Sequence, residues 1–282
     1  MTKKILLLAN RGLGDHVSSI VIAKNLSKGN YLHGIFSNLH GFNLIKQTPY
    51  LSSYSLLDVN IEFLPSGDVD FTKMKKKLSP IVEIFPLYEE VYVCRPGFLR
   101  SILKMFPINL QKNVVTPFAN YNKNIFRPLA MANEFGFKTK DISLNIEWYK
   151  DYYHDFKCDK NSILLNCDST YMNRTYIEKK SIKKELEKIG FDVREFDYSS
   201  DIRSNIHLIH QVEHIITTDT STLWLAKALN KQPHVFLAAN DLPIKKMEVI
   251  LDVKNIISKK YKEINLIPPI EIVNGFLKTV LF

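Results

Sequence analysis

The fold class is decided by the stretch Ile5-Leu-Leu-Leu-Ala9-Asn10-Arg11-Gly12-Leu13-Gly14-Asp15, near the beginning of the chain. Residues 5–9 form a short continuous apolar run, which is typical of a buried parallel strand, and the glycines that follow predict a tight turn. Apolar residues then recur at helical spacing over 15–27, and Gly29 supplies a stop signal. This order of strand, turn and helix predicts an α/β fold with a parallel sheet.

The same alternation continues along the chain and restarts once. Further strands are expected over 32–36, 91–94, 114–116, 163–166, 193–196, 215–217, 235–237 and 256–257, and further helices over 181–189, 203–211 and 222–229. The segment 141–161 is aromatic and charged without a periodic pattern, which makes it a candidate linker. We therefore expect two Rossmann-like domains, 1–150 and 151–282, whose parallel sheets face each other across a ligand-binding cleft.

The composition limits the class of protein and the kind of partner. The chain has 282 residues, of which 45% are hydrophobic and 24% charged, as in a globular rather than a disordered protein. No apolar run approaches the roughly 18 to 20 residues of a membrane-spanning helix, so we expect a cytoplasmic protein without transmembrane segment or signal peptide. The three cysteines lack CxxC spacing, which indicates reduced thiols. The net charge of +9 favours anionic partners such as nucleotides, nucleic acid or an acidic membrane surface.

The first candidate site is the turn after the opening strand. Gly12 and Gly14 allow the backbone to approach a bound group, and the helix that follows presents unpaired N–H groups. Asp15 has two open interpretations: it caps the helix, or it is catalytic, because open α/β sheets bind ligands beyond the carboxyl ends of their strands. His16 is a candidate contact for a phosphate or an acceptor, and the alternative that we favour is an exposed first-turn histidine.

The second candidate site is the hydroxyl-rich turn Thr218-Asp219-Thr220-Ser221-Thr222 between an expected strand and an apolar helix. We expect these hydroxyl groups and the backbone N–H groups of the helix to point to one spot, where they would hold a diphosphate without a metal ion. The alternative is an ordinary helix cap provided by Asp219 or Ser221. Five capping-type residues in succession exceed what one cap needs.

Three motifs spread over most of the chain resemble the ADP-heptose:lipopolysaccharide heptosyltransferase family of GT-B glycosyltransferases, glycosyltransferase family 9. They are Gly14-Asp15, Gln47-Thr48-Pro49-Tyr50 and Thr218-Asp219-Thr220-Ser221. The resemblance implies that Asp15 is the catalytic base, that the late turn holds the donor diphosphate, and that Arg174 contacts the donor. The sequence departs from the family at Ser221, where the family has glycine, and at Trp224, where it usually has histidine.

The function that this resemblance implies is an inverting, metal-independent glycosyltransferase. It would move a sugar from a nucleotide-diphosphate sugar, held by the C-terminal domain, to a hydroxyl acceptor held by the N-terminal domain, by default a bacterial glycan or lipopolysaccharide core. No cofactor is expected besides this co-substrate. Asp15 would take the acceptor proton. The leaving diphosphate would be stabilised by Arg174, Thr220, Ser221 and Thr222.

Two other functions stay open. A viral-type DNA glycosyltransferase acting on a hydroxymethylated base would explain the positive charge, and lysine runs near 73–77, 179–184, 245–246 and 259–260 would then contact phosphates. A noncatalytic nucleotide-sugar binding protein would keep the fold without turnover. Metal sites are not expected, because Asp68-Val69-Asp70 is a tripeptide that occurs often by chance, and no cysteine or carboxylate completes a set with His207, His210 and His214.

Overall fold

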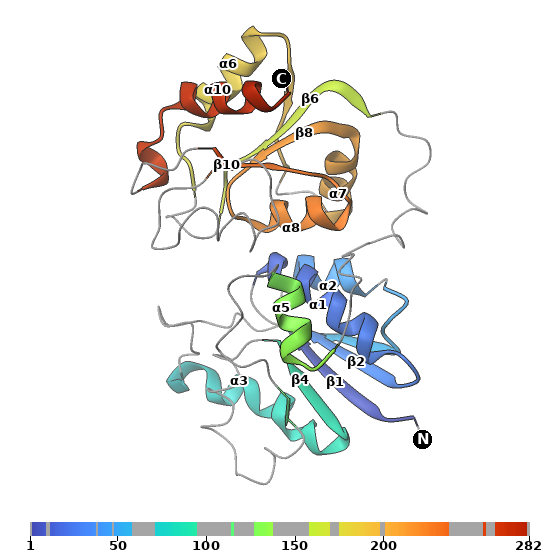
Figure 1. The fold of residues 1–282 in the computed structure, drawn as a ribbon. Coiled ribbons are helices and arrows are strands. Elements are labelled where there is room, and N and C mark those ends of the chain that lie inside the picture. The colour runs from blue at the N-terminus through green and yellow to red at the C-terminus, as the bar shows by residue number, and fades with distance from the viewer. Residues whose placement is uncertain are drawn as a thin grey trace. The chain divides into compact units, whose positions relative to one another are not determined.

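The chain forms two compact units, each built around one parallel sheet (Figure 1). The computed structural model describes residues 2–9, 12–37, 39–46, 48–57, 71–94, 114–115, 127–137, 158–169, 175–197, 201–236, 256–257 and 263–280. The first unit comprises Met1–Lys123 and Arg127–Ser143, and the second comprises Asn124–Phe126 and Leu144–Phe282. The domain boundary expected after residue 150 lies outside the described residues and stays a prediction.

The sheet of the first unit has the strand order β3-β2-β1-β4-β5, and every pairing is parallel. Its strands are β1 (Lys4–Ala9), β2 (Tyr31–Phe36), β3 (Ser53–Leu56), β4 (Glu90–Val93) and β5 (Val114–Val115). The helical elements are α1 (Leu13–Leu26), α2 (Leu39–Ile45), α3 (Phe71–Glu83), the 3-10 helix η1 (Phe85–Leu87) and α5 (Arg127–Glu134). The strand order reverses between β1 and β4, which makes the carboxyl ends of these two strands the switch point of the sheet.

The sheet of the second unit has the order β10-β9-β8-β6-β7 and is also parallel. Its strands are β6 (Asp159–Asn166), β7 (Asp192–Arg194), β8 (Val212–Thr217), β9 (His234–Phe236) and β10 (Ile256–Ile257). The helical elements are α6 (Lys179–Lys188), α7 (Ile202–Gln211), α8 (Ser221–Ala228), the 3-10 helix η5 (Ile264–Leu266) and α10 (Pro269–Val280). Here the order reverses between β6 and β8, so the switch point lies where Asn166 and Thr217 end their strands.

The central strands form because helices cover both faces of each sheet. Residues 5–9 of β1 are buried without alternation, as expected for a parallel strand packed on both sides. One face of β1 packs with Leu78 and Val82 of α3, and α1 packs against the sheet with a buried run from His16 to Ala23. In the second unit Phe276 of α10 joins the core of β6 and β8, and α6 and α10 pack side by side. These observations confirm the expected α/β class with two Rossmann-like parallel sheets.

Candidate functional site

Asp15 lies at the switch point of the first sheet. It is the third residue of α1, which begins after the turn that follows β1, and its backbone N–H donates to the Gly12 carbonyl at 3.0 Å. A Cβ atom built on Gly12 would lie 3.9 Å from Oδ2 of Asp15. Burial raises the pKa of the Cys94 thiol at the end of β4, and the nearby Asp15 carboxylate raises it further. The half-buried carboxylate thus lies between the ends of β1 and β4, where ligands of open α/β sheets bind.

The two glycines of this turn leave its backbone accessible. Gly12 is exposed and is the N-cap residue of α1, without a side-chain hydrogen bond at the cap. Gly14 is half-buried, and its carbonyl accepts a hydrogen bond from Ser18 Oγ at 3.0 Å. The charge of Asp15 complements the positive end of the helix, and its carboxylate is also partly open to solvent. The geometry therefore accommodates both roles expected for this carboxylate.

The expectation of an exposed His16 is wrong, because its side chain is completely buried. Helix α2 covers this side of α1, and Gly41 of α2 leaves the space that the imidazole fills: a Cβ atom on Gly41 would lie 2.3 Å from Cγ of His16. Nδ1 lies 2.9 Å from the Gly12 carbonyl oxygen. Burial lowers the pKa of His16. A direct contact of His16 with a phosphate or an acceptor would require the ring to leave this position.

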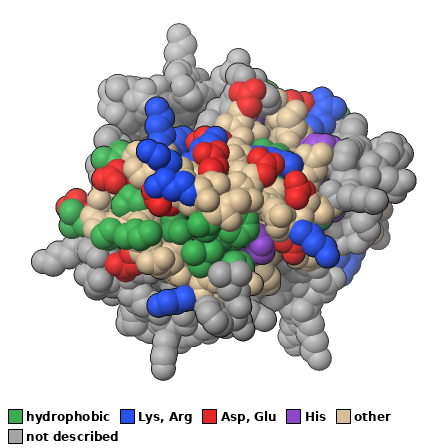
Figure 2. Space-filling view, turned by 90° about the horizontal axis from the view of Figure 1, so that it is seen from above, with side chains coloured by type: hydrophobic (Ala, Val, Ile, Leu, Met, Phe, Trp, Pro, Cys, Tyr) green, Lys and Arg blue, Asp and Glu red, His purple; other side chains and the backbone are tan. Residues whose placement is uncertain are grey.

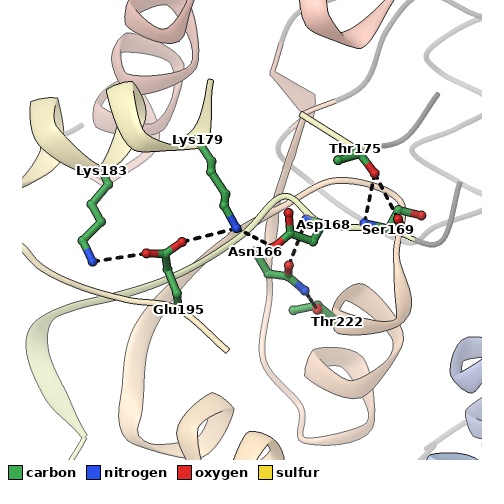
Figure 3. A network of polar contacts seen from close by, with 8 residues as sticks. All are labelled: Asn166, Asp168, Ser169, Thr175, Lys179, Lys183, Glu195 and Thr222. Carbon is green, nitrogen blue, oxygen red and sulfur yellow. Dashed lines mark hydrogen bonds and ion pairs between the residues drawn. The ribbon is translucent and has the colours of Figure 1, made fainter. Parts of the chain in front are cut away.

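The hydroxyl-rich turn lies at the switch point of the second sheet. It connects β8 to α8, and Asn166 at the end of β6 reaches across to it: Nδ2 of Asn166 donates to Oγ1 of Thr222 (Figure 3). Oδ1 of Asn166 accepts a hydrogen bond from the Asp168 N–H at 3.0 Å. Asn166 therefore ties the end of β6 to the first turn of α8.

The expectation that every hydroxyl of this turn points to one spot is wrong for Thr220 and Thr222. Thr222 is fully buried with its hydroxyl on Asn166, and Thr220, 8% exposed, has its hydroxyl 3.2 Å from that of Thr217. Both hydroxyl groups point inward because their partners lie at the ends of two strands. Asn166 ends β6 and contacts Thr222, and Thr217 ends β8 and contacts Thr220. Asp219 and Ser221 are half-buried, and Thr220, the N-cap residue of α8, makes no side-chain hydrogen bond at the cap.

Removal of the Asn166 side chain is expected to destabilise the second unit. Asn166→Ala leaves the buried Thr222 hydroxyl without this donor, and such an orphaned group costs about 1–3 kcal/mol. Urea unfolding followed by tryptophan fluorescence measures this loss, since Trp224 is a buried residue of α8. Adding Thr222→Val to Asn166→Ala should recover part of the lost free energy of unfolding. Strictly additive losses would show that the two side chains are not coupled.

Sequence reasoning missed a cluster of charged residues at the carboxyl ends of β6 and β7 (Figure 3). Nζ of Lys179, the first residue of α6, lies 2.6 Å from Asp168 Oδ2 and 3.5 Å from Glu195 Oε1. Lys183 binds the other oxygen of Glu195 at 3.2 Å. Burial lowers the pKa of Lys179, but Asp168 and Glu195 outweigh it and raise the pKa overall. The sequence does carry a signal for this cluster, because an acidic residue follows each of the two strands, Asp168 after β6 and Glu195 after β7. Lys179 itself belongs to a run of basic residues, which gives no indication of its acidic partners.

The lysines of α6 do not form a uniform basic track. Besides the contacts of Lys179, Lys183 lies 3.9 Å from Glu187, and Lys188 lies 2.5 Å from Glu185. Figure 2 shows basic and acidic side chains interspersed over the face that carries α6 and α10. Because Lys179, Lys183 and Lys188 are paired with acidic residues in this way, we interpret the run as an ordinary solvated helix face.

Several residues singled out in the sequence lie outside the described residues. They are Arg11, Gln47, Asp68, Asp70 and Arg174, together with the lysine pairs 245–246 and 259–260. In the part of the chain that is described, no group of three or more histidine, cysteine or acidic side chains is placed to hold a metal ion. Every helix of that part is too short or too polar to cross a lipid bilayer.

No family model and no curated protein sequence matches this chain. Solved structures match it over nearly its whole length. The Escherichia coli ADP-heptose lipopolysaccharide heptosyltransferase II is 12% identical with a TM-score of 0.64, and the match covers 99% of this chain and 98% of that one. The glycosyl transferase family 9 protein of Veillonella parvula is 10% identical with a TM-score of 0.65 and coverages of 99% and 97%.

A third neighbour is the Escherichia coli heptosyltransferase WaaC, solved with ADP-2-deoxy-2-fluoro heptose. It is 10% identical with a TM-score of 0.61, and the match covers 98% of this chain and 99% of that one. None of these three proteins is described as acting on DNA, so they give the DNA alternative no support. At such identities the likeness concerns the fold. The chain thus has the two-domain fold of heptosyltransferases and of a family 9 glycosyltransferase, as its sequence motifs predict.

Proposed function

We propose that the protein is an inverting, metal-independent glycosyltransferase that moves a sugar from a nucleotide-diphosphate sugar to a hydroxyl acceptor. The N-terminal domain, predicted over 1–150, would bind the acceptor, and the C-terminal domain, predicted over 151–282, would bind the donor. The default acceptor is a bacterial glycan or lipopolysaccharide core. The free thiols of Cys94, Cys158 and Cys167 fit the cytoplasmic location expected from the sequence.

One observation carries this proposal: the two motifs singled out in the sequence each lie at the switch point of their own sheet. Asp15 follows β1 beside the end of β4, and the turn 218–222 follows β8 beside the end of β6. Ligands of open α/β sheets bind at these positions. A partly exposed carboxylate in one unit and a helix N-terminus that follows a hydroxyl-rich turn in the other are the groups that a sugar transfer from a diphosphate needs.

The chemistry divides between the two motifs. The Asp15 carboxylate accepts the proton of the attacking acceptor hydroxyl while the bond between the anomeric carbon and the diphosphate oxygen breaks. Negative charge then grows on the leaving diphosphate, and the N-terminal N–H groups of α8 stabilise it together with the Ser221 hydroxyl. Asp219 belongs to the same turn, and Arg174 is assigned to the donor by the family resemblance. Thr220 and Thr222 support this surface through their inward hydrogen bonds.

A thermal-shift series with ADP, UDP, GDP and CMP tests the donor site. One nucleotide, added at about 100 times its dissociation constant, should stabilise the protein by about 2.7 kcal/mol and raise its Tm by about 5 °C or more. Ser221→Ala should weaken binding of that nucleotide about fivefold to tenfold, because a hydroxyl donor is lost. Ser181→Ala, on the exposed side of α6, is the matched control and should change nothing. A protein that binds none of the four nucleotides would contradict the proposed donor site.

A further inference from the structure

The Gly12 carbonyl group is a shared acceptor in the turn that carries Asp15. The Gly12 carbonyl oxygen accepts the N–H of Asp15 at 3.0 Å and the N–H of His16 at 3.3 Å. Nδ1 of the His16 ring lies 2.9 Å from the same oxygen. The N-cap residue of α1 is Gly12, which has no side chain, so the His16 imidazole supplies a side-chain contact to the carbonyl of the N-cap residue.

The surroundings of the His16 ring fix its position and its protonation. The ring is completely buried, lies 5.8 Å from the Phe36 ring between centroids, and occupies the space left by Gly41. Among the described residues, none forms a hydrogen bond with Nε2. Since a carbonyl oxygen only accepts, Nδ1 carries the proton. Burial lowers the pKa of His16 and favours the neutral imidazole, and it outweighs the Gly12 carbonyl, the Asp15 carboxylate and the Ala9 carbonyl, which act in the opposite direction.

We propose that His16 is a positioning residue: its Nδ1–H holds the Gly12 carbonyl and thereby fixes the turn from which α1 presents the Asp15 carboxylate. This inference rests on the proposed function, because the place of Asp15 matters for turnover only if Asp15 is the base. Gly41 is also required for this position of the ring. A methyl group at residue 41 would lie 2.3 Å from Cγ and 2.5 Å from Cδ2 of His16 and would force the ring to move.

The role in the turn is tested without any substrate. Exchange of the backbone amides at positions 15 and 16, measured by NMR and corrected for the change of side chain, should become about fivefold faster in His16→Leu, which loses the donor. His16→Asn places an amide N–H near the same carbonyl and should stay within about twofold of wild type. His40→Leu, an exposed neighbour of Gly41 on α2, is the matched control. Imidazole nitrogen shifts should show the Nδ1–H tautomer at pH 7, and an Nε2–H tautomer would overturn the proposal.

The catalytic consequence is tested with the nucleotide sugar whose nucleotide gives the largest thermal shift. His16→Leu should lower kcat for diphosphate release about tenfold with the donor KM unchanged, since Asp15 is displaced while the second unit is intact. His16→Asn should have a kcat close to that of wild type. Gly41→Ala should lower kcat about as much as His16→Leu, although His16 is still present. Gly41→Ala therefore tests the proposal even if His16→Leu fails to fold. Wild-type kcat in both His16→Leu and Gly41→Ala would overturn the positioning role and leave the transferase standing. If the wild-type protein shows no turnover, the proposed function fails, and the catalytic role of His16 fails with it. The amide exchange rates would then report only on the role of His16 in the turn.

Discussion

Asp15→Asn is expected to lower sugar transfer by about 10²–10⁴-fold and to leave nucleotide binding unchanged. The amide has nearly the shape of the carboxylate but cannot accept the proton of the acceptor hydroxyl, so only the chemical step suffers. Asp15 lies in the first unit beside Gly12, whereas the turn proposed to hold the donor lies in the second. Turnover and nucleotide affinity, measured on the same preparation, separate these two effects.

The matched control for this variant is Glu83→Gln, which neutralises an exposed carboxylate at the end of α3. It should keep wild-type turnover. Unchanged turnover in Asp15→Asn would remove Asp15 from the reaction. Nucleotide binding without turnover in the wild-type protein would instead favour the noncatalytic nucleotide-sugar binding protein that the sequence leaves open.

Acidification from pH 7.5 to pH 5 is expected to destabilise the second unit through His234. This side chain is 6% exposed, its Nδ1 lies 2.9 Å from Thr279 Oγ1, and its ring contacts those of Phe276 and His214 at centroid distances of 4.9 and 6.0 Å. Burial, with a smaller contribution from His214, lowers the pKa of His234 to about 4. The His234 ring, which connects β9 to α10 through its contact with Thr279, is therefore neutral at pH 7.

The sign follows from the difference between folded and unfolded chains. The unfolded histidine has a pKa near 6.5, so between about pH 6.5 and pH 4 the unfolded state binds more protons than the folded state. The contribution of His234 is complete above that window and decreases as the pH falls through it. At pH 5 the loss is about 2 kcal/mol.

Urea unfolding at the two pH values measures this loss in the second unit. Both tryptophans of the chain, Trp148 and Trp224, belong to that unit, so their fluorescence reports on it. His234→Asn keeps an N–H donor toward Thr279 but does not titrate, and should lose about 2 kcal/mol less than wild type between the two pH values. The exposed His40→Asn is the matched control. Equal pH dependence in wild type and His234→Asn would contradict the assignment.

The sequence predicts those elements whose signal is local. The apolar run before Gly12 and the helical spacing after it predict β1 and α1, and the same kind of pattern predicts β6 and β8. Strand β3 was missed because Ser53–Leu56 is a short, mostly polar strand that pairs with β2 at the edge of the described sheet. Helix α10 was missed although its signal is readable: Pro269 begins it, and Ile272, Val273 and Phe276 form its buried face.

The candidate site likewise contains residues that the sequence predicts and contacts that it does not predict. Asp15 and the turn 218–222 are predictable because each is a short motif directly after a strand. The burial of His16 depends on Gly41 of another helix, and the inward turn of Thr222 depends on Asn166 of another strand. The Asp168–Lys179–Glu195 cluster likewise joins three elements. Contacts between segments far apart in the sequence cannot be predicted from the spacing of residues within either segment.

The central claim, that this chain is an inverting glycosyltransferase with Asp15 as its base, is tested most directly by proton NMR of the first sugar product. The nucleotide sugar with the most stabilising nucleotide is incubated with the protein, with and without EDTA, and the anomeric configuration is read before mutarotation. We predict release of the nucleoside diphosphate at the same rate under both conditions, with a sugar whose anomeric configuration is opposite to that of the donor, and loss of both signals in Asp15→Asn. Retained configuration, or no release beyond the level of Asp15→Asn, would contradict the account.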